Sequence, residues 1–413
     1  MKILHIIYST SGGAGIAVLR LHRALMEQGI ESRVLTANSA LAGDDIIRVS
    51  ETGHKRYVVP RIPIIDKWIR LLRRKGYCLT EFEKLEREEL RLDKLYPAYF
   101  DMPISNYELE NHPLVAWADI VHIHWISGFV NFPTFFAKIK KPIVWTMHDL
   151  NPFYGGFHHY RLREKYLEKY SDLENLCMKI KHDVITQTDN VSLVAISSRM
   201  HQLMTEHDTY KDKQIFDIHN CIDPEQFPIL NKQFIREALG WGKNKRVFLF
   251  VNKNMNDSAK GLVDFVAALD QLCLAETMLV CVGDGALPQS SNVEMMQYRS
   301  VNDTIWLAML YTAADYLAFP SKQEAFPSTP LESMLCGTPV IMTPVSGAVD
   351  MMTDKTGVIA DGYEPQNLAN AIMELLNKQY DSVQLRQHVV DNFGPAVIAK
   401  SHIDMYNQLM QGK

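Results

Sequence analysis

The sequence predicts an α/β protein built from two doubly wound parallel sheets. Short apolar segments alternate with amphipathic helical segments along most of the chain, as expected for buried parallel strands covered by helices. This alternation is interrupted near residues 222–230, where Pro224 and Pro228 fall, and then begins again. With 413 residues, the chain is too long for one typical core and long enough for two such domains.

The first half, residues 1–222, is expected to form one α/β domain. Its first strand, residues 2–9, is followed by glycines and by a helix that stops at Gly29. A second helix is expected at residues 133–140. The other apolar segments that we interpret as strands are residues 31–38, 119–125, 141–149, 191–198 and 214–222.

The second half repeats this order over residues 223–394. The expected strands are residues 245–252, 277–285, 316–321 and 338–344. The expected helices are residues 260–272, 330–337 and 367–379. A last helix begins near Ala396, within a C-terminal segment that covers residues 395–413.

An insertion at about residues 55–96 does not follow the alternation. Residues 55–75 carry eight basic residues and one acidic residue, and Trp68 lies on the apolar face of a predicted helix. Such a helix suits an anionic membrane surface. The alternative, which we favour, is that its apolar face packs on its own domain. The acidic helical segment 80–95 would then pair with the basic one.

Composition excludes several classes of protein. The net charge of −5 disfavours general nucleic-acid binding, so an anion site must be local. The six cysteines form no Cys-x-x-Cys pair and indicate reduced thiols. The sequence contains no run of eighteen apolar residues and no signal-peptide pattern. We therefore expect a cytoplasmic protein, with peripheral contact at the inner face of the plasma membrane as an open alternative.

A glycine-rich turn follows the first strand. Glycines there let a backbone approach a ligand, and the helix N-terminus favours an anion. Reading Gly13 and Gly15 as the start of a dinucleotide fingerprint leaves Val18 where the third glycine should be. No acidic residue ends the second strand, so an NAD-linked enzyme is disfavoured. An ordinary tight turn remains the alternative.

Histidines gather near the ends of two later strands. His122 and His124 alternate on one strand, and His148 and Asp149 end the next. A His-x-His pair can chelate a metal, but no supporting carboxylate spacing accompanies it, so we expect no metal and two packed strand residues. Residues at the carboxyl ends of parallel strands face the ligand crevice, which favours His148 and Asp149 as functional residues.

Two further features lie in the second half. Lys260 stands at a helix start after a strand, where it would neutralise a phosphate, and Lys253 precedes it in the same loop. Glu324 and Glu332 stand eight positions apart in SKQEAFPSTPLES, with two prolines between them. Thr329 with Glu332 fits a capping box at a helix start, which would explain Glu332 by structure alone. Glu324 has no such explanation.

Taken together, these motifs resemble the retaining nucleotide-sugar glycosyltransferases of family four, in particular the polysaccharide-assembling bacterial members. The resemblance rests on the glutamate–seven–glutamate phrase over residues 313–341. It extends to SGGAG, DIVHIHW, TMHDLNPFYGG, NCID and KGLVDF. It implies the GT-B fold, in which two doubly wound Rossmann-like domains face a central cleft. The N-terminal domain would bind the acceptor, and the C-terminal domain would bind the nucleotide-sugar donor. The last helix would cross back to the N-terminal domain.

The resemblance also implies roles for the residues of the glutamate phrase. Glu324 would be catalytic, binding donor-sugar hydroxyls and supporting positive charge near the anomeric carbon. Glu332 would bind the ribose hydroxyls. The backbone near Phe326, Pro327 and Ser328 would face the donor sugar and the diphosphate.

The resemblance implies further roles for residues of the glycine-rich turn, for His148 and Asp149, and for Lys260. Lys260 would neutralise the diphosphate, and His148 would contact the donor sugar near the reacting centre. Gly13 would allow close approach of the donor phosphate. Gly12 and Asp149 would belong to the loop that meets acceptor or phosphate.

One departure from the family pattern concerns the diphosphate. The family often has an arginine a few residues before the lysine, and this chain has VNK, so Lys253 would have to replace it. Lysine supplies the charge without the bidentate geometry of arginine. Because the sequence contains no Asp-x-Asp motif, we expect neither a metal nor another cofactor.

The expected function is therefore hexosyl transfer with retention, from a nucleotide-sugar to a glycan or lipid-linked glycan. Cations and helix N-termini would stabilise the leaving diphosphate, and a carboxylate would stabilise the oxocarbenium-like ring. The alternatives are a nucleotide-sugar epimerase or a phosphorylase on the same fold, or a non-catalytic nucleotide or glycan binder. The sequence does not identify the sugar, the base, the acceptor or the oligomeric state.

Overall fold

The computed structural model describes residues 1–39, 41, 43–50, 81–242, 244–301 and 303–411. Its contacts divide the chain into two compact units. Unit 1 comprises Met1–Val18, Ile30–Val194 and Leu203–Phe216, and unit 2 comprises Leu19–Gly29, Ala195–Gln202 and Asp217–Lys413. The basic segment 55–75 lies outside the described residues, so the predictions made for it stay predictions, as do the predicted domain boundaries.

The sheet of unit 1 has seven strands in the order β3-β2-β1-β4-β5-β6-β7. The strand pairings from β3 to β5 are parallel. β4, β5 and β6 are buried along their whole lengths, because both faces of the sheet are covered. The strands are β1 Lys2–Ser9, β2 Glu31–Asn38, β3 Ile46–Arg48, β4 Ile120–Ile123, β5 Ile143–Met147, β6 Val191–Ala195 and β7 Gln214–Asp217.

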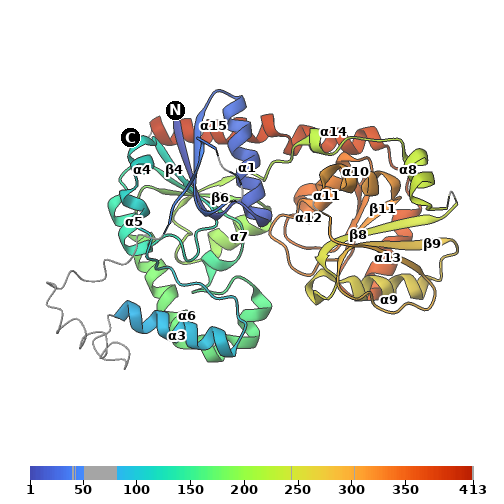
Figure 1. The fold of residues 1–413 in the computed structure, drawn as a ribbon, viewed down its shortest axis with the longest axis horizontal. Helices are drawn as coiled ribbons and strands as arrows, with labels where there is room; N and C mark the ends of the chain where they lie inside the picture. Colours follow the sequence, from blue (N-terminus) through green and yellow to red (C-terminus); the bar gives the residue numbers. More distant parts are fainter. Residues whose placement is uncertain (40, 42, 51–80, 243, 302, 412–413) are drawn as a thin grey trace. The chain divides into compact units, whose positions relative to one another are not determined.

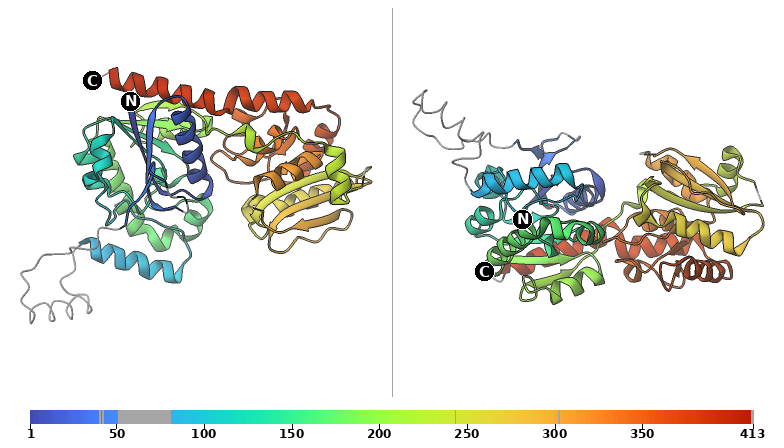
Figure 2. Two further views of the ribbon diagram at one scale, coloured as in Figure 1. Left: turned by 45° about the horizontal axis from the view of Figure 1, so that its top comes forward. Right: turned by 90° about the horizontal axis from the view of Figure 1, so that it is seen from below.

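The predicted helix after the first strand is confirmed, and it begins earlier than expected, with the glycines themselves. The acidic segment also forms the predicted helix, α3. It lies along the long helix α6 (Figure 1), and both views of Figure 2 agree. The helices are α1 Gly12–Glu27, α3 Glu81–Leu95, α4 Pro113–Trp117, α5 Phe132–Lys138, α6 Tyr160–Thr186 and α7 Ser198–Glu206, with 3₁₀ turns at η1 Leu109–Asn111 and η2 Asn151–Phe153.

The sheet of unit 2 has six strands, all parallel, in the order β10-β9-β8-β11-β12-β13. The predicted strands are present, whereas β10 and β13 were not predicted. The strands are β8 Arg246–Asn254, β9 Thr277–Asp284, β10 Glu294–Tyr298, β11 Tyr316–Phe319, β12 Val340–Met342 and β13 Gly357–Ile359.

Alternate residues of β8 enter two separate cores, one on each face of the sheet. Val247 and Leu249 join the core formed with α10, α11 and α14, whereas Phe248 and Phe250 join the core formed with α9 and α13. Figure 1 shows α9 and α13 together on one side of this sheet. The helices are α8 Lys232–Leu239, α9 Leu262–Leu272, α10 Thr304–Ala313, α11 Thr329–Leu335, α12 Ala348–Met351, α13 Pro365–Leu376, α14 Ser382–Phe393 and α15 Pro395–Gln411, with 3₁₀ turns at η3 Pro224–Gln226 and η4 Ser258–Lys260.

Both sheets therefore have the doubly wound parallel order that the sequence predicted. Among the described residues, no helix combines the length and the apolar character that crossing a membrane requires.

Candidate active site

In each sheet the strand order reverses at one central position, where ligands of doubly wound proteins bind. In unit 2 this position lies between β8 and β11, and in unit 1 it lies between β1 and β4. Lys260 follows β8 and Glu324 follows β11. Strand order alone therefore brings these two predicted residues to the same edge of the unit 2 sheet.

Lys260 and Glu324 form an ion pair. The Lys260 ammonium lies 2.5 Å from Oε1 of Glu324, and the hydroxyl of Ser321 donates to the same oxygen at 2.7 Å. Both side chains remain partly exposed, 28% and 16% respectively, so a ligand can reach them. Because both contacts fall on Oε1, Oε2 can accept a hydrogen bond from a ligand.

The backbone of the loop that carries Lys260 packs closely against the backbone of the loop that follows β11. Gly261 has φ +70°, and a Cβ there would lie 2.0 Å from the carbonyl oxygen of Pro320. The backbone N–H of Lys322 donates to the carbonyl of Ala259 at 2.7 Å, and the Lys322 side chain forms an ion pair with Asp264. Glycine at 261 is what permits this approach.

Glu332 lies in the first turn of α11 and accepts hydrogen bonds from two hydroxyls. The Tyr311 hydroxyl donates to Oε2 at 3.0 Å, and the Ser328 hydroxyl donates to Oε1 at 2.9 Å. Burial, followed by the nearby charge of Glu332, raises the pKa of Tyr311 well above its usual value. Tyr311 is therefore a permanent donor that orients this carboxylate.

The predicted capping box at Thr329 is wrong. The N-cap residue of α11 is Ser328, whose side chain makes no capping hydrogen bond, and Thr329 is the first helical residue. Ser328 has helical backbone angles, φ −83° and ψ −28°, so its hydroxyl bonds the Glu332 carboxylate instead of a backbone N–H. Helix capping therefore does not account for Glu332.

The segment between the two glutamates is held by contacts within unit 2. The ring of Phe326 stacks on His219, with centroids 5.1 Å apart and planes within 10°. The Ser346 hydroxyl donates to the carbonyl of Ala325 at 2.8 Å. Pro327 follows Phe326 and precedes Ser328, so these contacts fix the backbone predicted to face the donor.

Lys253 lies exposed near the end of β8. The register of β8 with β9 shifts between Val251 and Asn254, so the strand is irregular where Lys253 stands. Within the part of the chain that the structure describes, no hydrogen bond or ion pair joins Lys253 to Glu324 or Glu332. Its predicted replacement of the family arginine stays a prediction.

In unit 1, Gly12 and Gly13 open α1 directly after β1. Gly12 has φ +75°, and a Cβ built on either glycine meets no atom within 4 Å. At Gly15 a Cβ would lie 2.3 Å from the backbone of Thr10. The first two glycines thus border open space, whereas Gly15 is required for packing the turn.

His148 and Asp149 directly follow β5, as predicted. Burial lowers the pKa of His148 to about 4, against a smaller opposing effect of the Asp149 charge, so the ring is neutral at physiological pH. Its Nε2 lies 3.1 Å from Nδ1 of His124. His148 can therefore exchange a hydrogen bond with a ligand without bringing a positive charge.

Asp149 is the centre of a partly buried network that the sequence did not reveal. It accepts hydrogen bonds from Nδ1 of His158 at 2.5 Å and from Nε1 of Trp125 at 2.7 Å. Nε2 of His158 also lies 2.9 Å from Asp101. Burial alone would lower the pKa of His158, but its bonds to the two carboxylates outweigh burial and raise it to about 9. Burial likewise opposes ionisation of Asp149, yet its bonds, chiefly to His158, hold its pKa below the usual value.

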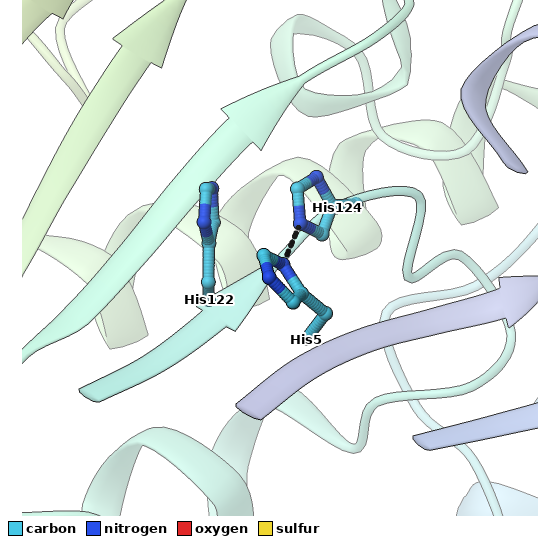
Figure 3. Close-up of side chains that lie close together, drawn as sticks. All are labelled: His5, His122 and His124. Carbon is cyan, nitrogen blue, oxygen red and sulfur yellow. Dashed lines mark hydrogen bonds between the residues drawn. The ribbon is translucent and has the colours of Figure 1, made fainter. Parts of the chain in front are cut away.

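His122 is a buried residue of β4, as predicted, whereas His124 is buried but lies one residue past the end of β4. The two histidines have a third neighbour. His5 of β1 joins them, and the ligand atoms of the three rings lie within 4.8 Å of one another. Figure 3 shows the three rings meeting on one face of the sheet. The sequence separates His5 from the other two by more than 110 positions, so only strand pairing could have placed it there.

Sequence reasoning also missed Ser321 and Tyr311, which hold the two glutamates. Ser321 lies within the glutamate phrase, three residues before Glu324, and its position at the end of a predicted strand was an available signal. Tyr311 lies on α10 among buried apolar residues, where nothing in the local pattern distinguishes it from a core residue.

Known proteins resemble this chain along almost its entire length. A D-inositol 3-phosphate glycosyltransferase of Corynebacterium glutamicum is 24% identical, covering 96% of this chain and 92% of that protein. One from Mycobacterium tuberculosis is 25% identical, covering 89% and 71%. Among solved structures, sucrose-phosphate synthase from Thermosynechococcus elongatus has a TM-score of 0.65 at 18% identity, with both chains covered completely. Anabaena HepE in complex with UDP has a TM-score of 0.59 at 17% identity, covering 99% and 100%.

Two family models match the chain in sequence. The model described as Glycosyl transferases group 1 matches residues 231–392, which include Lys260, Glu324 and Glu332. The model described as Glycosyltransferase Family 4 matches residues 11–226, just over half of the chain, from the glycine turn to the end of η3. With two Rossmann-like parallel sheets and glycosyltransferases of the GT-B fold as structural neighbours, the chain belongs to glycosyltransferase family 4.

Proposed function

We propose that this glycosyltransferase is retaining and metal-independent, and that it moves a hexosyl group from a nucleotide-sugar to a glycan or lipid-linked glycan. The reaction would take place in the cytoplasm and contribute to cell-surface polysaccharide. The proposal rests on the ion pair of Lys260 and Glu324 at the position where the strand order of the unit 2 sheet reverses. It also rests on Glu332, whose carboxylate accepts hydrogen bonds from two hydroxyls. A cation and two carboxylates at one sheet edge suit a ligand with a diphosphate, a ribose and a sugar.

The charges of the pair match the charge that develops when a sugar leaves a diphosphate. The bond between the anomeric carbon and the diphosphate oxygen breaks, leaving negative charge on the phosphate and positive charge on the ring. Lys260 would turn from Glu324 to the diphosphate, and Glu324 would then face the sugar hydroxyls and the ring. Glu332, fixed by Tyr311, would accept from the ribose hydroxyls.

The neutral ring of His148 would contact a hydroxyl of the donor sugar. A neutral imidazole adds no positive charge beside a ring that is itself becoming positive, which favours the transition state. Gly12 and Gly13 would leave room for a phosphate or the acceptor, and Asp149 would stay ionised because His158 and Trp125 donate to it.

Lys260 supplies the charge that a divalent cation would otherwise bring to the leaving group, which supports a metal-independent reaction. The relatives named D-inositol 3-phosphate glycosyltransferases suggest an inositol phosphate as a second candidate acceptor. Because HepE was solved with UDP, UDP-glucose is the first donor to test.

The test begins with thermal denaturation of the protein in the presence of UDP-glucose, other nucleotide-sugars and EDTA. A ligand that binds the native state raises the melting temperature. The stabilising donor is then incubated with lipid-linked glycan acceptors or inositol phosphate, and the product's anomeric configuration is read by NMR. A product with the donor's configuration, formed equally with EDTA, supports the proposal. Inversion, dependence on metal, or epimerised donor without acceptor would overturn it.

A further inference from the structure

Histidines from three adjacent strands of unit 1 meet at the candidate site. His5 lies on β1, His122 lies on β4, and His124 and His148 directly follow β4 and β5, respectively. β1 and β4 are parallel neighbours, and their register pairs His5 with His122. His124 directly follows β4, its backbone N–H donates to the carbonyl of Ile6 on β1 at 3.0 Å, and its ring lies beside the other two. Figure 3 shows His5, His122 and His124 together there.

Three of these rings form one continuous chain of hydrogen bonds. Nδ1 of His5 lies 2.9 Å from Nε2 of His124, and Nδ1 of His124 lies 3.1 Å from Nε2 of His148. His5 and His124 are 0% and 2% exposed, whereas His148 is partly exposed. This series of hydrogen bonds therefore runs from the buried sheet to His148, the residue expected to contact the donor sugar.

A neutral imidazole has one N–H donor and one acceptor nitrogen. Each N···N contact needs one donor and one acceptor, so His124, bonded at both nitrogens, must donate to one neighbour and accept from the other. If His5 donates to His124, then His124 donates to His148, and His148 carries its proton on Nδ1. If the order is reversed, Nδ1 of His148 is an acceptor.

We propose that His5 and His124 are positioning residues that set the tautomer of His148, so that its Nδ1 presents one fixed hydrogen-bonding role to the donor sugar. The role of His148 toward the sugar rests on the proposed function, whereas the coupling of the three tautomers does not. Burial lowers the pKa of His148 to about 4 and so supports the neutral ring that this coupling requires.

The other contacts hold the central ring in place. The ring of His122 stacks on that of His124, with centroids 4.1 Å apart, and Nε2 of His122 lies 2.7 Å from the hydroxyl of Thr146. The side-chain N–H of Trp145 donates to the carbonyl of His124 at 3.2 Å. Rotation of the His124 ring would break its hydrogen bonds to His5 and His148, and it would also disturb this packing.

A metal ion is the competing explanation for His5, His122 and His124, whose ligand atoms lie within 4.8 Å of one another. A metal bound at Nδ1 of His5 or Nε2 of His124 would replace the hydrogen bond between them. The two explanations therefore predict different ring states, and the experiment separates them.

The experiment uses the full chain labelled with ¹⁵N-histidine and records the ring nitrogen shifts at pH 7. His148→Gln identifies the His148 signal by its loss. We expect neutral His5, His124 and His148, each as a single tautomer with the same donor direction. We also expect His5→Leu to change the tautomer population of His148 and His5→Asn to restore it, since the asparagine amide can occupy the place of Nδ1. His402→Leu, a change at a buried histidine of α15 in unit 2, is the control and should leave the population unchanged.

Several outcomes would overturn the proposal. They are a His148 tautomer unaffected by His5→Leu, opposing donor directions in the wild-type rings, a charged His5 or His124, or stoichiometric zinc retained through purification. The wild-type spectrum decides the donor direction even if His5→Leu does not fold. With an active donor and acceptor, His5→Leu should lower kcat on the order of tenfold with little change in the donor KM, and His5→Asn should recover it. Absence of transfer in the wild type would refute the proposed function and leave the tautomer result standing.

Discussion

Lys260 and Glu324, which stand 64 positions apart, meet in an ion pair of 2.5 Å at the carboxyl edge of the unit 2 sheet. Each side chain would otherwise carry an uncompensated charge in a partly buried loop. The pair is therefore a resting arrangement in which each group neutralises the other. A ligand with a phosphate and sugar hydroxyls offers both groups better partners, which gives the pair a direct role in binding.

Glu324→Gln should abolish most of the transfer activity while leaving the protein folded. The amide can keep a hydrogen bond with Ser321 but cannot stabilise positive charge on the sugar ring. Loss of one preorganised electrostatic group costs about 10²- to 10³-fold in kcat. The measurement is the initial rate at saturating donor, together with the thermal midpoint. Glu374→Gln, which removes a carboxylate from an exposed pair with Lys378, is the control and should leave the rate unchanged. Near-normal turnover in Glu324→Gln would refute its catalytic role.

Lys260→Met should weaken binding of UDP by about ten- to a hundredfold, because a charge-assisted hydrogen bond contributes about 1.5–3 kcal/mol. Calorimetric titration with UDP measures the effect, and titration with uridine is the control because uridine lacks phosphate. Lys253→Met tests the second lysine in the same way. If Lys253 replaces the family arginine, its removal should also weaken UDP binding and spare uridine. Equal losses for UDP and uridine would indicate a disturbed loop instead of a lost phosphate contact.

The stability of unit 1 should fall as pH rises from about 6.5 to about 9, because His158 is protonated between Asp101 and Asp149. Its folded pKa, about 9, lies above the ordinary value of about 6.5. The stabilisation that such a group provides is complete at pH values below its pKa in the unfolded chain. It is lost as pH rises through its pKa in the folded protein. The shift corresponds to about 3 kcal/mol at most.

Thermal midpoints of the wild type and of His158→Gln, recorded from pH 6 to pH 9.5, measure this contribution. The difference between the two proteins should be largest near pH 6 and should shrink as pH approaches 9. His201→Gln, which removes a histidine from an exposed pair with Asp217, is the matched control and should show no such trend. A difference that is independent of pH would mean that His158 is neutral in the folded protein.

Most of the fold, but only part of the site, could be predicted from the sequence. Buried parallel strands are continuous apolar segments, so their order along the chain was readable. Lys260 and Glu324 could be identified because each lies in the connection that follows a strand. The position of His5 beside the other histidines could not be predicted, because it depends on the register of β1 with β4.

The prediction for Thr329 failed for a local reason. Ser328 and Thr329 both suit a helix start, but the pattern Ser/Thr-x-x-Glu fits only Thr329 with Glu332, because the third residue after Ser328 is Leu331. The structure places the boundary one residue earlier than predicted. Tyr311, on α10, then binds the carboxylate that a capping box would have used, a contact between segments that no local pattern contains.

Gly261→Ala should disrupt the donor site far more than Gly240→Ala, although both glycines have the same backbone conformation. Gly240 has φ 70° and ψ 17°, and Gly261 has φ 70° and ψ 16°. The left-handed conformation costs a non-glycine residue about 1–2 kcal/mol, so this strain is common to both variants. A Cβ at Gly240 meets nothing within 4 Å, whereas one at Gly261 would lie 2.0 Å from the Pro320 carbonyl oxygen. Alanine at 261 must therefore separate the Lys260 loop from the loop that leads to Glu324.

Urea denaturation and UDP titration of both variants separate these effects. Gly240→Ala should lose stability by the strain alone and bind UDP normally. Gly261→Ala should lose more stability and also bind UDP less tightly, because Lys260 and Glu324 are held in position by the contact that the new methyl group breaks. Equal stability losses with unchanged UDP affinity would show that the loops adjust without moving Lys260. The close approach of Gly261 to Pro320 would then belong to the packing of the unit 2 sheet and not to its ligand site.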